Sequence, residues 1–563
     1  MMGASAEVAM SQEARWRFAK ATLALLICAV VAIAYWLYWA LFPELPAGSV
    51  GNDALFLADG ARRIAAGQVP HKDFHLPTGA LPFFTYLYAE RLFPQLPAYI
   101  GAHLLGFLLI SPILVAAMSQ IERWPHALAL GSLVAVAALL PFNTSRGEDF
   151  GLVFHASYNR LSTALSLAYL AWLFGANPSS RATGGIVIAY ALLMALFLKI
   201  VAAGVILAPL TILAFMNRRW RPAAAAGGVI VVAVLLLLEM ETEIVSGYIA
   251  DISAMSAINR NSVPYFFASF IFKTIALQAL VGVLILWMLV ERWHASSPHD
   301  RWDALSIPLA MMAAVGALSL AESQSTGGLE FAGALGLLFA KSFIGGGLQI
   351  GRVASYVAAA SLLAGPLLIG AFENTIALSL DRQGKPVEVH WVARFMPRTV
   401  VPEPMVNKAE AMVALWDSVE MTTAARSNLG AQLVNRSDPD LYLAQWLTVD
   451  RALQRLAERR YEDLGRVATL ANVDFFGFAI DAQRARGLKV VHDVGRTILP
   501  LTSGQARTYI ADADTVFVPN CAMNEAPGFE RMSLWFKGVL EAEFSSAMLT
   551  PCWMVHRRNP TAG

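Results

Sequence analysis

Three carboxylates lie close together in the stretch between residues 51 and 79, GNDALFLADGARRIAAGQVPHKDFHLPTG. They are Asp53, Asp59 and Asp73, and the stretch follows directly after the first long apolar segment of the chain. Ionised groups beside a membrane are costly unless they have partners or a function. A carboxylate held at a hydroxyl group can act as a general base. We therefore expect the chemistry of this chain in this stretch.

The residues around Asp53 predict how it is positioned. Asp53 precedes a predicted amphipathic helix, 54–66, and an aspartate there caps a helix well, so its simplest role is structural. A turn at 67–70, the polar segment 71–74 and a further turn follow, before Pro82 opens an aromatic helix. An aromatic helix beside a polar loop is typical of an element lying along the bilayer surface.

The composition indicates a membrane protein. The 563 residues are 57% hydrophobic and 15% charged, whereas soluble domains have about 25% charged residues. The net charge of +1 argues against nucleic acid as a partner. Three cysteines cannot form a multi-cysteine metal site. Cys521 and Cys552 form either a disulfide, if their part of the chain is outside the cytoplasm, or two buried thiols.

Apolar segments recur up to residue 372 and predict about eleven membrane spans. They occupy residues 21–42, 97–118, 126–141, 161–176, 184–198, 200–216, 223–240, 265–290, 304–320, 330–347 and 353–372. The first is too long for the apolar part of a signal peptide, so we interpret it as an uncleaved helix. Basic residues in alternate short loops place the N-terminus in the cytoplasm and, after an odd number of spans, the C-terminus outside.

The sequence thus predicts an α-helical polytopic membrane protein with two parts. Residues 1–372 form a multi-spanning domain whose long first outer loop is 43–96, and residues 373–563 form an extracytoplasmic α/β domain. In the second part, helices are predicted at 440–460 and 530–544, and short strands at 467–473, 488–491, 515–519 and 552–556. Helices alternating with short buried strands are typical of a layered α/β domain.

The first outer loop resembles the membrane glycosyltransferases of the GT-C superfamily, the bacterial mannosyl-, arabinosyl- and galacturonosyltransferase-like proteins. There, an acidic residue follows the first span and precedes an amphipathic helix, a Gly-x-x-Pro-Tyr-x-Asp-Phe-like segment and a Pro-x-Gly turn. The corresponding residues here are Asp53, the segment 67–74 (GQVPHKDF) and 77–79 (PTG), with His71 where the family has tyrosine. The motif covers about 40 residues, and the similarity of topology covers roughly two thirds of the chain.

This resemblance implies transfer of a sugar from a polyprenyl-phosphate donor to an envelope glycan, lipid or protein, with inversion, at the outer face of the bacterial cytoplasmic (inner) membrane. Such a reaction needs a general base at the acceptor hydroxyl, and cations or hydrogen-bond donors at the phosphate. Asp53 is the candidate base. Asp73 is the alternative base or orients the acceptor, and His71 and Lys72 are candidate substrate-binding residues.

A second outer loop, between residues 141 and 160, adds polar side chains. The candidates for substrate binding there are Glu148, Asp149, His155, Tyr158, Asn159 and Arg160. The guanidinium of Arg160 suits a phosphate, but an arginine at the start of a span also reaches lipid headgroups. The same two interpretations, phosphate binding and contact with lipid headgroups, apply to Lys199. A lone histidine such as His155 is more often a packing or hydrogen-bonding residue than a metal ligand. A divalent cation would suit the acidic loops, but no spacing defines a metal site.

Two other classes of protein stay open. A transporter or flippase of a lipid-linked or polar substrate would show related halves and interrupted helices, and the halves of this chain do not resemble each other. A non-catalytic envelope assembly protein would use the C-terminal domain as its binding module. It would tolerate Asp53→Asn, which an inverting transferase would not.

Overall fold

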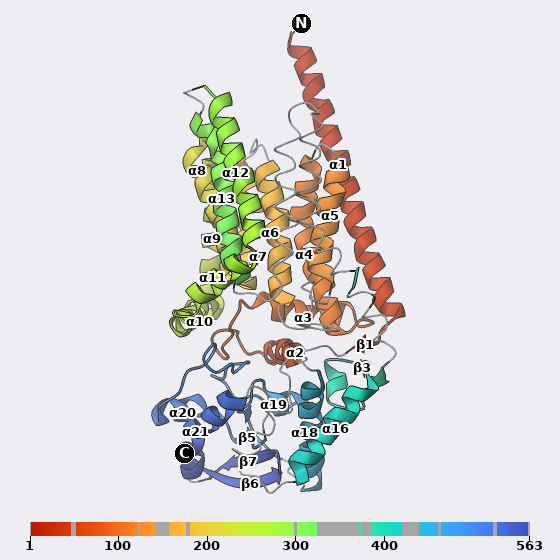
Figure 1. Cartoon of the computed structure of the whole chain (residues 1–563), viewed down its shortest axis with the longest axis vertical. Coiled ribbons are helices and arrows are strands. Elements are labelled where there is room, and N and C mark those ends of the chain that lie inside the picture. Colours follow the sequence, from red (N-terminus) through yellow and green to blue (C-terminus); the bar gives the residue numbers. More distant parts are fainter. Residues whose placement is uncertain are drawn as a thin grey trace.

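The computed structural model describes most of the chain. The described residues are 2–46, 52–121, 124–140, 157–175, 181–297, 301–323, 372–373, 376, 384–418, 439–459, 463–521 and 526–560. This part of the chain is mostly helical, and its longer strands lie near the C-terminus. Helices fill one end of the molecule, and residues 384–560, which we call the C-terminal part, fill the other (Figure 1).

A bundle of apolar helices forms the first end (Figure 1). Its members are α1 (Met2–Leu41), α4 (Ala98–Gln120), α5 (Trp124–Leu139), α6 (Ser157–Gly175), α7 (Arg181–Leu198), α8 (Ile200–Met216), α9 (Arg221–Thr242), α12 (Ile275–Ala295) and α13 (Arg301–Ser323). A short 3-10 helix, η1 (Arg218–Trp220), joins α8 to α9. Among the described residues, four helical segments are long and apolar enough to cross a membrane: Phe18–Leu41, Ala98–Gln120, Arg218–Thr242 and Arg301–Ala321.

The predicted span 265–290 is wrong as a single helix. The structure divides it into α11 (Val263–Lys273) and α12, with Thr274 between them. Both the backbone N–H and the hydroxyl of Thr274 donate to the carbonyl of Phe270, at 3.0 and 2.7 Å. The predicted spans 330–347 and 353–372 lie outside the described residues, apart from Phe372.

Short helices lie between the bundle and the C-terminal part (Figure 1). They include α2 (Asn52–Ala65), α3 (Leu81–Leu92) and α10 (Ile244–Asn259). Helix α2 begins at Asn52, so Asp53 lies in its first turn and not ahead of it. Helix α10 carries Asp251, which is buried.

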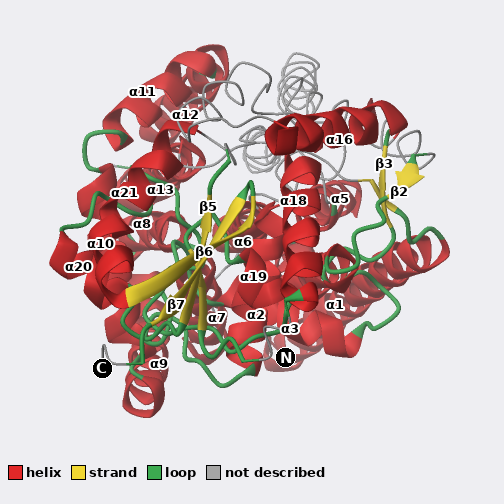
Figure 2. Ribbon diagram, turned by 90° about the horizontal axis from the view of Figure 1, so that it is seen from below, coloured by secondary structure: helices red, strands yellow, loops and turns green. Residues whose placement is uncertain are grey.

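The C-terminal part contains a four-stranded sheet in the order β4-β5-β7-β6 (Figure 2). Its strands are β4 (Val467–Thr469), β5 (Thr515–Pro519), β6 (Phe544–Thr550) and β7 (Trp553–Arg558), and only β4 and β5 pair in parallel. The surrounding helices are α16 (Glu403–Ser418), α18 (Pro439–Glu458), α19 (Phe475–Ala479), α20 (Ser503–Tyr509) and α21 (Ala526–Glu543).

The predicted elements of this part are largely present. Helices α18 and α21 and strands β4, β5 and β7 overlap their predicted ranges. Strand β6 was missed, because Ser545 and Ser546 interrupt its apolar residues and its side chains show no regular alternation in burial. Residues 488–491 form no regular strand. They make isolated bridges instead, one of which joins Lys489 to His75 of the first loop.

The first loop and the C-terminal part are joined at several points. Strand β1 (Leu45–Pro46) pairs with β3 (Thr399–Val401), which also pairs with β2 (Lys385–Pro386). Along the chain, the 3-10 helix η2 (Val392–Arg394) connects β2 to β3. One continuous hydrophobic core contains Trp39 of α1, Phe83 of α3 and Trp446 of α18. A second, smaller core lies between the sheet, α20 and α21. A disulfide joins Cys521 to Cys552, so the first of the two predicted alternatives is confirmed.

Candidate functional site

Asp53 lies where the bundle, α2 and the C-terminal part meet. Its negative charge acts on the hydroxyls of Tyr99 in α4 and Tyr158 in α6, which places both rings near the carboxyl group. Arg496 and Asp493 of the C-terminal part are the charged groups that act on it from the opposite side. Tyr158 was a candidate substrate-binding residue, and the charge of Asp53 acts on its hydroxyl.

Burial raises the pKa of Asp53 from its ordinary value near 4 to about 7. The positive charge of Arg496 lowers this pKa, and the negative charge of Asp493 raises it further. The first turn of a helix favours a carboxylate, because the helix dipole is positive there. A carboxyl group with a pKa near the working pH suits general-base catalysis, since it is both available and basic.

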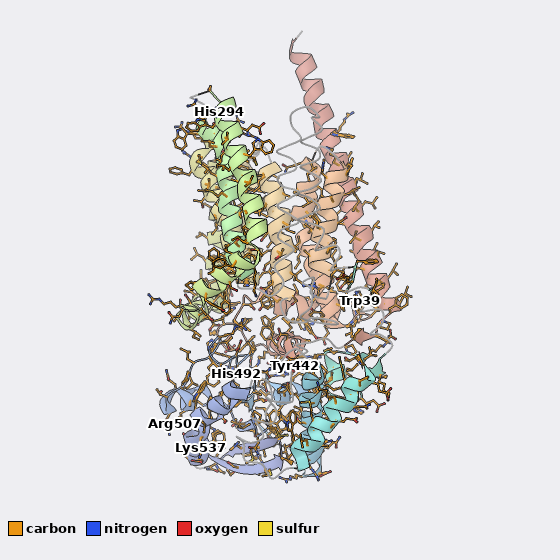
Figure 3. All side chains as sticks on the ribbon, viewed as in Figure 1. Trp39, His294, Tyr442, His492, Arg507 and Lys537 are labelled. Atoms are coloured by element: carbon orange, nitrogen blue, oxygen red, sulfur yellow. A yellow bond between two sulfur atoms is a disulfide. The ribbon has the colours of Figure 1, made fainter. Side chains whose placement is uncertain are left out.

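The segment 491–498 holds Arg496 in place. Asp493 forms an ion pair with Arg496 at 3.0 Å, and the backbone amide of Asp493 donates to the Thr497 hydroxyl at 2.7 Å. Asn259, at the end of α10, donates to the carbonyl of Arg496 at 3.0 Å. His492, labelled in Figure 3, contacts the Ala471 carbonyl at 2.7 Å through Nδ1. The segment is therefore tied both to α10 and to the core of the C-terminal part.

Arg160 and Lys199 lie in the bundle, where Arg160 is buried and Lys199 is half-buried. Arg160 is 6% exposed and donates through one nitrogen to the carbonyl of Leu140, and its other terminal nitrogen is buried without a partner in the described part of the chain. Lys199 donates to the amide oxygen of Asn159 at 2.8 Å. Asn159 and Arg160 are neighbours on α6, so Lys199 contacts the same turn of the helix that carries Arg160.

His71 is part of a buried cluster that the sequence did not reveal. Asp251 of α10 contacts Nδ1 of His71 and Nδ1 of His75, each at 2.7 Å, and accepts the backbone N–H of Leu76 at 3.2 Å. Burial raises the pKa of Asp251, but the two histidines outweigh burial and hold it at about 2. His71 has φ of 65°, and its Nε2 is buried without a partner among the described residues. A strained residue of this kind often marks a functional site.

Asp73 and Lys72 have structural partners. The Asp73 carboxylate accepts the backbone N–H of Val69 at 2.8 Å, which closes the turn before it, and lies 4.0 Å from the guanidinium of Arg486. Lys72 forms an exposed ion pair with Glu243 at 3.0 Å. Both residues therefore shape the loop, and of the two candidate bases Asp53 has the environment that suits the role.

A buried group of four charges fixes α2 to the C-terminal part. Arg63 donates to Asp59 at 2.7 Å and to Asp474 at 2.9 Å, and Arg484 donates to Asp59 at 2.9 Å. All four side chains are at most 5% exposed. Burial and the charge of Asp59 raise the pKa of Asp474 despite its arginine partners. We call Asp59, Arg63, Asp474 and Arg484 the charge quartet.

Hydrogen bonds also hold the N-terminal end of α2. Asn52, the residue before Asp53, donates to Gln445 of α18 at 2.7 Å and accepts from the indole of Trp446 at 3.1 Å. Because Asn52 and the charge quartet lie at opposite ends of α2, the C-terminal part sets both the position and the tilt of the helix that carries Asp53.

Three predicted residues, Glu148, Asp149 and His155, lie outside the described residues. No group of three or more histidine, cysteine or acidic side chains suited to a metal ion occurs among the residues that the structure describes. Sequence reasoning singled out Asp59 but missed its partners in the charge quartet, and it also missed Arg496, Asp493 and Asp251 as site residues. The contacts that join these residues to the first loop and α2 span at least 175 positions, and no local spacing pattern records such contacts.

Comparisons with known proteins assign no relative to the chain. No protein-family model, no curated protein and no solved structure matches it. The site therefore has to be interpreted from its own geometry.

Proposed function

We propose that this chain is a polytopic membrane glycosyltransferase of the GT-C type, with about eleven spans and with its site and C-terminal part outside the cytoplasm. It transfers a sugar from a polyprenyl-phosphate donor to an envelope glycan, lipid or protein. The observation that carries the proposal is Asp53: a carboxyl group with a pKa of about 7, in a short helix at the end of an apolar bundle, with Arg496 as the cation that acts on it. The disulfide supports an oxidising compartment for the C-terminal part.

The reaction divides among these residues as follows. Asp53 accepts the proton of the acceptor hydroxyl while that oxygen attacks the anomeric carbon, and the bond to the phosphate oxygen breaks on the opposite face. Direct displacement with one base inverts the anomeric configuration. Arg160 and Lys199 stabilise the negative charge that remains on the polyprenyl phosphate.

The experiment compares two aspartate substitutions in cells that lack the protein. Asp53→Asn preserves side-chain size, and Asp303→Asn changes an aspartate in the first turn of α13, at the opposite end of the bundle (Figure 1). Mass spectrometry of envelope glycolipids and polysaccharides should show a lost modification that wild-type protein and Asp303→Asn restore. Asp53→Asn should fail to restore it, with a loss of about a hundredfold or more in rate.

Either of two results would contradict the proposal. An unchanged glycan profile in cells without the protein, compared with cells that express it well, would favour a transporter or an assembly protein. Full restoration by Asp53→Asn at normal expression would remove Asp53 as the base, and Asp73 would be the first replacement to test.

A further inference from the structure

A groove of about 610 Å³ lies between the second half of α18 and the turn that joins β6 to β7. Its walls are Thr448, Arg451, Gln454, Arg455, Glu458 and Arg459 on one side and 548–552 on the other. The volume lies in the range of sites that bind small ligands or short polymer segments. Strands β6 and β7 lie at the end of the molecule farthest from the bundle, so this groove is separate from the Asp53 site (Figure 1).

The charge of the groove is predominantly positive. Arg451, Arg455 and Arg459 follow one another at intervals of four residues, which places them along one face of α18 and the turn after it. The single acidic side chain among the described lining residues is Glu458, which pairs with Arg455 at 2.7 Å. Three guanidinium groups against one carboxylate give an excess of two positive charges, although the whole chain carries only +1.

The opposite wall is held rigidly. Arg459 donates to the carbonyl of Met548 at 3.0 Å, and the disulfide ties Cys552 to Cys521 beyond β5. Trp553 donates through its indole N–H to the hydroxyl of Thr448 at 3.2 Å, across the base of the groove. The hydroxyl of Thr550 is buried without a partner in the described residues. The groove therefore exists before a ligand enters, and it has a polar group left to satisfy.

The side chains that line the groove indicate which kind of ligand it can bind. None of the described lining residues is aromatic, so the groove has no flat surface on which a neutral sugar ring would stack. Guanidinium groups instead bind carboxylate or phosphate oxygens through paired hydrogen bonds. We propose that this groove binds an anionic glycan, whose carboxylate or phosphate groups are spaced along the row of arginines. The choice of a glycan rests on the proposed function, and the choice of an anion rests on the groove alone.

Binding to the full-length protein in nanodiscs tests this inference without any transfer reaction. The probe is an oligogalacturonate of about six residues, which is longer than the row of three arginines, since eight residues at roughly 1.5 Å of helix rise span about 12 Å. The wild type should bind it, with an affinity that falls as salt is added. Replacing Arg451, Arg455 and Arg459 together by glutamine should weaken binding about tenfold or more.

A matched variant removes the same number of positive charges elsewhere. Lys385, Lys537 and Arg557 are exposed and lie outside the groove, and their joint replacement by glutamine should leave binding unchanged. Equal weakening in both triple variants would mean that net charge alone attracts the probe and would overturn the inference. Tighter binding of polyglutamate, equal binding of neutral maltohexaose, or no wild-type binding at millimolar probe would overturn it as well. The binding test involves no sugar transfer. A protein that does not bind the probe could therefore still be a glycosyltransferase, and a protein that binds it could lack transferase activity.

Discussion

At the scale of single residues, the ionisation of Asp53 is the property that the site controls most directly. Burial favours the neutral acid, whereas catalysis as a base needs the anion, so the pKa of about 7 places the change in the physiological range. The unfolded chain ionises Asp53 near pH 4 and the folded chain near pH 7. The contribution of this group to folding stability is therefore greatest at low pH and is lost as the pH rises from about 4 through about 7.

The first prediction concerns this ionisation. For the wild type, kcat/KM should rise with pH to a plateau with a midpoint near 7, because only the anion accepts the proton. Arg496→Gln removes a positive charge and should move the midpoint upward, whereas Asp493→Asn should move it downward. pH–rate profiles of the three proteins check this. Midpoints that stay the same in both variants would show that another group titrates.

A second prediction tests the charge quartet with two neighbouring arginines of α2. Arg63→Met leaves Asp59 and Asp474 buried with one partner fewer, and removing one member of a buried ion pair costs about 3 to 5 kcal/mol. Arg62→Met breaks only a half-exposed pair with Glu90 and should cost less than about 1 kcal/mol. Chemical denaturation in detergent measures both. Equal losses would mean that the quartet does not hold α2.

At the scale of elements, the packing of α10 against the first loop determines where His71 lies. Gly247 faces the backbone of His71 so closely that an added Cβ would lie 2.3 Å from the His71 carbonyl oxygen. Tyr248 contacts the His71 ring, with centroids 4.7 Å apart, and the next turn of α10 supplies Asp251. One helix therefore positions the loop through a small residue, an aromatic ring and a carboxylate.

The third prediction follows from this contact. Gly247→Ala should push the loop away from α10, destabilise the protein by about 1 to 3 kcal/mol and reduce transfer. Gly282→Ala in α12 is the matched control, since nothing lies within 4 Å of its added Cβ, and it should be neutral or slightly stabilising. Thermal unfolding and activity assays of both variants make the comparison. Wild-type behaviour of Gly247→Ala would show that the loop can move without consequence.

At the scale of the whole molecule, the first loop and the C-terminal part behave as one assembly. Strands β1 and β3 pair, the charge quartet spans both, and the larger hydrophobic core is continuous between them. The disulfide lies away from this junction, between the end of β5 and the turn before β7.

The fourth prediction uses the disulfide to test the topology. If the C-terminal part is outside the cytoplasm, Cys521 and Cys552 should resist alkylation until the protein is reduced, and alkaline phosphatase fused to the C-terminus should be active. Replacing both cysteines by serine should cost about 3 to 4 kcal/mol, as expected for a loop of this length. Activity of a fused reporter that works only in the cytoplasm would contradict the proposed topology.

The sequence by itself determined the elements whose signal is local. Apolar length predicted the helices of the bundle, the pattern after residue 53 predicted α2 and α3, and periodicity predicted α18. These signals lie within one or two turns of the chain and so can be found without tertiary information. The single helix expected at 265–290 is divided at Thr274, whose backbone leaves the helical conformation inside an otherwise apolar run that gives no local signal for the break.

Only the tertiary structure decided which residues form the site. Asp53 was identifiable from its place after the first span, but Arg496 lies more than 400 positions away and Asp251 almost 200. The pKa of Asp53 depends on burial and on the charges of Arg496 and Asp493, which no spacing in the sequence relates to Asp53. The sequence likewise does not show that the members of the charge quartet are partners. They are far apart along the chain, and only the fold brings them together away from water. Buried charged residues form ion pairs, because an unpaired charge is costly away from water.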